Sequence, residues 1–183
     1  MLMVLLGGAR SGKSSLAIEI ARRSDRPVTF IATGEPLDAE FAERIDRHRA
    51  ERPGTWQTIE EPTELEAAIA QPDDDAVVII DCLTLWVANL FGRDLAEDAI
   101  VERASGIAKL ASDRPSPVIV VTNEVGSGIV PADALSRSYR DTLGRVNAIF
   151  TAHADQAFLV VAGRVLPLIE PDVKSIASER SLP

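Results

Sequence analysis

The stretch that decides the fold is LMVLLGGARSGKSSLAIEI, residues 2–20. Its first five residues are apolar and predict a buried β-strand. The next eight residues, GGARSGKS from Gly7 to Ser14, match the phosphate-binding loop pattern G-x-x-x-x-G-K-[ST], and a helical pattern follows to about Arg23. Such a loop between a strand and a helix is the setting in which this motif binds a nucleoside triphosphate.

Each part of this loop (the P-loop) has its own expected task. Glycines let the backbone curl so that its N–H groups point at phosphate oxygens. Lys13 is expected to contact the β- and γ-phosphates and is a candidate catalytic residue, and the Ser14 hydroxyl would help to hold Mg²⁺. The predicted nucleotide-binding residues of the loop are Gly7, Gly8, Ala9, Arg10, Ser11, Gly12, Lys13 and Ser14.

Short apolar runs alternate with longer helical patterns along the rest of the chain, which is typical of a mostly parallel sheet with crossover helices. Further strands are predicted at residues 27–32, 76–80 and 117–122. Helices are predicted at about residues 38–50, 63–70, 83–91, 97–112 and 132–154. The last two apolar runs, 157–162 and 165–169, are separated by Gly163-Arg164 and predict a hairpin with an antiparallel edge strand. We expect one α/β domain of the P-loop NTPase-like (RecA-like) class over residues 1–170, and a tail without an assigned role at 171–183.

Composition narrows the possible partners. The chain has 183 residues and a formal net charge of −9, which argues against a broad basic surface for nucleic acid. Its one cysteine, Cys82, excludes an internal disulfide and suits a reducing cytoplasm. The apolar start, Met1–Leu6, is far shorter than the roughly 20 residues of a membrane span. We therefore expect a cytoplasmic protein without a nucleic-acid or membrane partner.

Asp81 directly follows the apolar run AVVII. P-loops of this type work with an acidic residue at the end of another buried strand, so Asp81 is expected to bind Mg²⁺ together with Ser14. The alternative is that Asp81 only caps the helix that begins near Leu83. At this point a kinase, a nucleotidyltransferase, a GTPase and a motor all remain possible.

His48 stands on the predicted helix 38–50, close to the apolar stripe that contains Phe41 and Ile45. The simplest interpretation is a semi-buried structural histidine. The alternative is catalytic: a neutral imidazole can attack an α-phosphorus and expel pyrophosphate, and nearby cations would stabilise the developing charge. The cations around it are Arg44, Arg47, Arg49 and Arg52.

Several segments together carry a resemblance to a known family. They are GGARSGKS, RIDRHRAERP at 44–53, W-x-x-x-E at 56–60, TNEVGSGIVP at 122–131, and the run from 136 to Gly163. On these segments the chain resembles the bifunctional adenosylcobinamide kinase / adenosylcobinamide-phosphate guanylyltransferase family of cobalamin biosynthesis.

The resemblance implies two reactions. The chain would phosphorylate adenosylcobinamide with ATP or GTP, and would then transfer GMP from GTP to that phosphate through a guanylylated histidine, which the motif places at His48. It also implies Mg²⁺, a homotrimer, and a further set of nucleotide contacts at Thr33, Arg49, Arg52, Glu60 and Asp81.

Glu124 and the loop 126–131 are expected on the corrinoid or phosphate-acceptor side, at the carboxyl edge of the sheet. Two alternatives to the bifunctional enzyme are a simple small-molecule P-loop kinase with a structural His48, and a regulatory nucleotide-binding switch.

Overall fold

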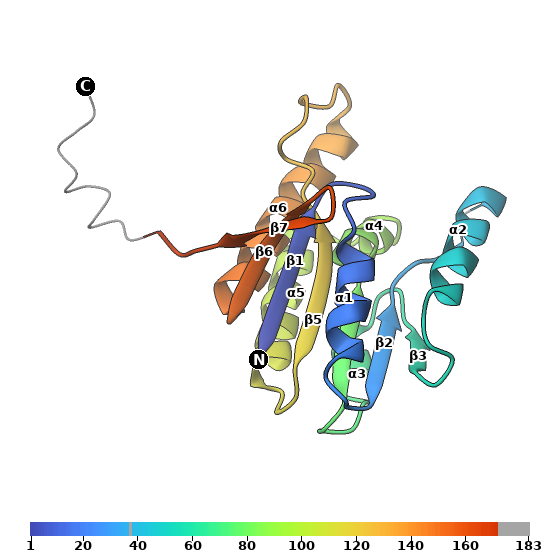
Figure 1. The fold of residues 1–183 in the computed structure, drawn as a ribbon. Helices are drawn as coiled ribbons and strands as arrows, with labels where there is room; N and C mark the ends of the chain where they lie inside the picture. The colour runs from blue at the N-terminus through green and yellow to red at the C-terminus, as the bar shows by residue number, and fades with distance from the viewer. Residues whose placement is uncertain (37, 172–183) are drawn as a thin grey trace.

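A computed structural model of the chain describes residues 1–36 and 38–171, apart from the side chains of Phe41 and Arg44. Its centre is a seven-stranded sheet in the order β3-β2-β4-β5-β1-β6-β7 (Figure 1). The parallel strands are β1 (Leu2–Gly7), β2 (Val28–Ala32), β3 (Gln57–Glu60), β4 (Val77–Asp81), β5 (Val118–Asn123) and β6 (Gln156–Val161). The edge strand β7 (Arg164–Leu168) is antiparallel to β6, so the predicted mostly parallel α/β fold is confirmed.

Six helices connect the strands in this part of the chain. They are α1 (Lys13–Arg22), α2 (Ala39–Ala50), α3 (Leu65–Ile69), α4 (Leu83–Phe91), α5 (Glu97–Asp113) and α6 (Ala134–His153). Helix α2 begins at Ala39, directly after Asp38, in agreement with the helix predicted at about residues 38–50. Helix α6 begins after Asp133, whose carboxylate accepts a 2.7 Å hydrogen bond from the Ser136 N–H. None of the described helices is long and apolar enough to cross a bilayer.

The strands bury side chains on both faces of the sheet, as their period of two requires. From β1, Leu2, Val4 and Leu6 pack into the core beneath α3, α4, α5 and α6. Met3 and Leu5 point the other way and pack with α1. Strands β1 and β5 are therefore covered on both sides, and the ends of the parallel strands meet at one edge where ligands bind in open α/β sheets.

Two local predictions were wrong. Strand β3 was missed because three of its four residues are exposed and only Ile59 gives an apolar signal; the parallel pairing with β2 creates this strand. The hairpin turn is Ala162-Gly163, one residue earlier than predicted, because both residues adopt left-handed φ values of 49° and 72° and Arg164 already belongs to β7. Of the predicted tail, residues 172–183 lie outside the described part of the chain.

Candidate active site

The P-loop lies between β1 and α1 and depends on glycine at two positions. Gly7 ends β1, and a Cβ there would lie only 2.2 Å from the Val160 carbonyl oxygen. Gly12 is the N-cap of α1 with φ of 100°, a conformation that L side chains rarely adopt. The chain can therefore curl tightly and present the N-terminus of α1 to an anion.

Lys13 is held at the base of this loop. Only 6% of the residue is exposed, and its ammonium donates hydrogen bonds to the carbonyl oxygens of Gly7 (2.9 Å) and Gly8 (2.7 Å). Burial lowers the pKa of Lys13, while the nearby acidic groups of Cys82 and Asp81 oppose that shift. Phosphate oxygens entering the loop would offer this buried cation charged partners in place of the two carbonyls.

Asp81 ends β4 and faces the P-loop helix. Burial raises the pKa of its carboxyl group, whereas a hydrogen bond from Ser14 and the charges of His48, Arg52 and Lys13 lower it. The interpretation that Asp81 only caps the next helix is wrong, because the N-cap of α4 is Cys82.

The pair Ser14 and Asp81 fits Mg²⁺ by its chemistry. A carboxylate and a hydroxyl are hard oxygen donors, and Mg²⁺ in nucleotide sites uses one or two protein ligands together with substrate phosphates. Within residues 1–36 and 38–171, no group of three or more His, Cys, Asp and Glu side chains could hold a metal ion.

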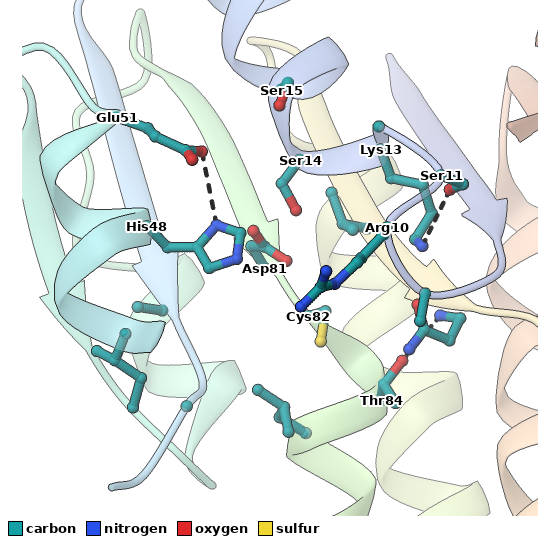
Figure 2. A pocket seen from close by; sticks show the side chains of 18 of the residues that line it. Arg10, Ser11, Lys13, Ser14, Ser15, His48, Glu51, Asp81, Cys82 and Thr84 are labelled. Carbon is teal, nitrogen blue, oxygen red and sulfur yellow. Dashed lines mark hydrogen bonds and ion pairs between the residues drawn. The ribbon is translucent and has the colours of Figure 1, made fainter. Parts of the chain in front are cut away.

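His48 projects from α2 across the site. Figure 2 shows its ring directed toward Asp81, with Ser14 beyond. Its Nδ1 lies 3.6 Å from a carboxylate oxygen of Glu51, the first residue after α2, and the other ring nitrogen is on the side of Asp81. The side chain is 40% exposed, so His48 is not a core histidine.

The two arginines that follow His48 lie differently. The Arg52 guanidinium stacks 3.8 Å from the centroid of the Phe30 ring, and its buried Nε has no hydrogen-bond partner among the described residues. Burial lowers the pKa of Arg52, and the charge of Asp81 is the largest influence that opposes this shift. Arg49 instead pairs with Glu60 and, at 3.6 Å, with Asp46 on the exposed side of the helix.

These groups enclose one cleft of about 410 Å³. Of the residues predicted from sequence, it brings together Ala9, Arg10, Ser11, Gly12, Lys13, Ser14, His48, Arg52, Glu60 and Asp81. Gly7 and Gly8 contribute through the carbonyls that bind Lys13. Arg49 lies beside the cleft, not in its lining. Thr33 is wholly buried and exchanges hydrogen bonds of 2.7 and 2.8 Å with the main chain of Cys82, so it fixes the ends of β2 and β4 instead of facing the cleft.

Sequence reasoning missed several lining residues. Thr84 and Leu85 occupy the first turn of α4, and Glu51 follows the end of α2. Two signals in the sequence could have identified them. Thr84 and Leu85 come just after the end of β4, and Glu51 comes three residues after His48. Glu124 is not in the lining of this cleft; its carboxylate accepts from the N–H groups of Gly126 (2.7 Å) and Ser127 (3.0 Å), and its expected place on the acceptor side stays a prediction.

Comparison with known proteins shows the family to which the chain with this cleft belongs. The model for cobinamide kinase / cobinamide phosphate guanyltransferase matches residues 3–168, nearly the whole described chain. The chain belongs to this family. The predicted bifunctional enzyme of cobalamin biosynthesis is thereby confirmed over a simple P-loop kinase and a regulatory switch.

Curated relatives align in sequence with this chain along nearly their full length. The bifunctional adenosylcobalamin biosynthesis protein CobP of Pseudomonas aeruginosa is 39% identical over 166 residues, covering 90% of this chain and 95% of CobP. The corresponding protein CobU of Salmonella typhimurium is 41% identical over 179 residues, covering 89% of this chain and 97% of CobU.

Solved structures with much lower identity share the fold alone. The RadB recombinase has a TM-score of 0.51 at 16% identity, over 86% of this chain and 73% of RadB. The type III secretion ATPase EscN of enteropathogenic E. coli has a TM-score of 0.60 at 9% identity, over 88% of this chain and 43% of EscN. These likenesses support the P-loop NTPase class assigned to the family member described here.

Proposed function

We propose that the single cleft described above performs both reactions of the family. In the first, the hydroxyl of adenosylcobinamide takes the γ-phosphoryl group of ATP or GTP. In the second, His48 takes GMP from GTP and passes it to adenosylcobinamide phosphate, giving adenosylcobinamide-GDP. The observation that carries this proposal is that His48 and the P-loop line the same cleft, with Asp81 between them (Figure 2).

The kinase step uses the P-loop side of the cleft. The N–H groups of the loop and the α1 N-terminus bind phosphate oxygens, and Lys13 neutralises charge on the β- and γ-phosphates. Ser14 and Asp81 would hold Mg²⁺, which would neutralise phosphate charge when it is bound. The chain's own contribution is therefore mainly the position and electrostatics of the phosphates.

The guanylyl step uses the α2 side. A neutral imidazole nitrogen of His48 bonds to the α-phosphorus, the bond to the bridging oxygen breaks, and pyrophosphate leaves with the electron pair. The substrate phosphate then attacks the same phosphorus and frees His48. The Glu51 carboxylate, 3.6 Å from Nδ1, would stabilise the positive charge of the ring that forms. Arg52, with its unpaired Nε, is suited to the charge that develops on the phosphoryl oxygens.

The remaining parts of the proposal concern assembly and setting. We place the protein in the cytoplasm as a homotrimer, with residues 1–170 as the catalytic domain and 171–183 as an appended tail. Exposed apolar side chains support subunit contacts: Ile129 is 96% exposed, and Val130, Leu135, Leu166 and Leu168 are also exposed.

A pair of variants tests the kinase step and the guanylyl transfer step separately. His48→Ala should keep the phosphorylation of adenosylcobinamide and lose transfer of GMP to the phosphorylated product. His153→Ala is the matched control, because this exposed histidine lies at the end of α6 and outside the cleft. Equal loss of both activities in a folded His48→Ala protein would contradict the division of labour.

A further inference from the structure

The end of strand β5 places one neutral amide between the two halves of the phosphate site. Strand β5 lies between β1, which leads into the P-loop, and β4, which ends at Asp81. The register sets Asn123 opposite Gly7, the first P-loop residue, while Val121 is opposite Asp81. Because residues two apart in a strand point to one face, Val121 and Asn123 both line the cleft.

The main chain of Asn123 is fixed from both sides. Its N–H donates a 2.8 Å hydrogen bond to the hydroxyl of Thr84, which lies at the start of α4 and is labelled in the lower part of Figure 2. Its carbonyl accepts a 2.9 Å hydrogen bond from the Asn147 amide of α6, and Asn147 in turn accepts from Thr122 at 2.7 Å. The next residue, Glu124, donates its N–H to the Gly7 carbonyl at 3.1 Å. Two helices and the P-loop strand therefore hold this strand end in one position.

The side chain of Asn123, by contrast, has no hydrogen-bond partner in the described part of the chain, although it lines the cleft. A carboxamide offers two N–H donors and one carbonyl acceptor, so it can donate to a phosphoryl oxygen and accept from a hydroxyl at the same time. Because it is neutral, it does not repel the phosphates as a second carboxylate would.

We propose that the Asn123 carboxamide aligns the γ-phosphoryl group with the substrate hydroxyl in the kinase step. In that step the hydroxyl oxygen bonds to the γ-phosphorus, and the bond to the bridging oxygen breaks. The electron pair leaves on the nucleoside diphosphate, and the hydroxyl proton passes to water. Asn123 takes no proton; it touches both reacting groups and holds their geometry. Asn147 and Thr84 are positioning residues that act through its main chain.

This assignment rests on the proposed function and divides the cleft further. His48 and Lys13 lie on opposite sides of the cleft with Asp81 between them (Figure 2), and Asn123 lies on the strand next to the P-loop. Its contribution should consequently fall on γ-phosphoryl transfer and not on attack at the α-phosphorus.

The test is Asn123→Ala, which removes the carboxamide but keeps both main-chain hydrogen bonds, so the fold should be retained. With adenosylcobinamide and saturating triphosphate, the kinase kcat should fall by about 10²-fold, the usual loss for one aligned donor. The amount of GMP on His48 after incubation with α-labelled GTP should equal that of the wild type. The control is Gln156→Ala, because Gln156 is an exposed amide at the start of β6. This variant should change neither the kinase kcat nor the amount of GMP on His48.

A kinase kcat within twofold of the wild type, or parallel loss of both readings, would overturn the role of Asn123. Melting temperatures of both variants identify a folding defect, and in that event Asn123→Ser provides the same comparison with a smaller cavity. If the wild type itself lacks either reading, the proposed function fails instead, so the two failures are distinguishable.

Discussion

Replacing Asp81 by Asn should make the nucleotide-free protein more stable and the nucleotide complex weaker. Burial raises the pKa of Asp81, which means that its charged form is disfavoured in the folded chain when no cation is bound. Asn keeps an acceptor for the Ser14 hydroxyl and removes the charge. The role of Asp81 therefore has a stability cost that the variant should relieve.

The magnitude follows from the size of the chain and the position of the residue. Stabilising replacements of this kind contribute about 0.5–2 kcal/mol, and the partial exposure of Asp81 favours the lower half of that range. For a chain of this size, about 1 kcal/mol shifts the melting temperature by roughly 2–4 °C. Wild-type protein with Mg²⁺ and GTP at 100 times Kd should gain about 2.7 kcal/mol. Asp81→Asn should lose most of that gain.

The pH dependence carries a definite sign. A carboxyl group whose pKa is raised by folding has its full stability below its unfolded pKa and loses stability as the pH rises toward the folded value. The difference in melting temperature between Asp81→Asn and the wild type should thus be largest near neutral pH and shrink toward about pH 4. Differential scanning fluorimetry from pH 4 to 8, with and without Mg²⁺ and GTP, measures both effects.

The control for this experiment is Asp75→Asn, which removes the same charge from an exposed turn residue before β4. It should shift neither the nucleotide-free melting temperature nor the nucleotide-induced gain. A less stable Asp81→Asn protein at neutral pH, or one that keeps the full gain with Mg²⁺ and GTP, would refute the assignment of Asp81 as a cation ligand in the cleft.

Three further predictions follow from single contacts. Gly12→Ala, at φ of 100°, should incur about 1–3 kcal/mol of backbone strain and weaken GTP binding by calorimetry, whereas Gly54→Ala, where a Cβ meets no atom within 4 Å, should not. Asp133→Ala should lose the N-cap of α6 and lower the unfolding free energy by about 0.5–2 kcal/mol in urea titrations while GTP binding persists; a drop in affinity instead would place Asp133 in the site. Lys13→Ala should depress both reactions in steady-state assays, since both need bound triphosphate, and a loss confined to one reaction would contradict its shared role.

The parallel sheet and the P-loop could be predicted because their signals are local. Five apolar residues before GGARSGKS specify a buried strand, and the loop itself dictates the turn and the helix that follow. Strand β3 could not be predicted in the same way, since its residues gain strand structure only by pairing with β2 at the sheet edge. The hairpin turn was placed one residue late because Ala162, an ordinary residue, adopts a left-handed φ of 49°.

The candidate site was predictable where residue type and strand end coincide. Asp81 and Lys13 meet in the cleft as expected, since parallel strands deliver both to one edge. The buried position of Thr33 and the inward turn of the Glu124 side chain depend on tertiary hydrogen bonds that no spacing reveals. Asn123 lies at the end of β5, between β1 and β4, and this position follows from the strand order, which the sequence does not specify.

The central claim is that His48 forms a covalent bond to GMP within the same cleft that binds the triphosphate. The direct measurement is mass spectrometry of peptides after incubation with GTP and Mg²⁺, at neutral to alkaline pH because a phosphoramidate is labile in acid. The account predicts one GMP adduct on the peptide that contains His48, and loss of the adduct in His48→Ala but not in His153→Ala. An adduct on another residue, or GMP transfer to adenosylcobinamide phosphate with no adduct on His48 at any time, would contradict it.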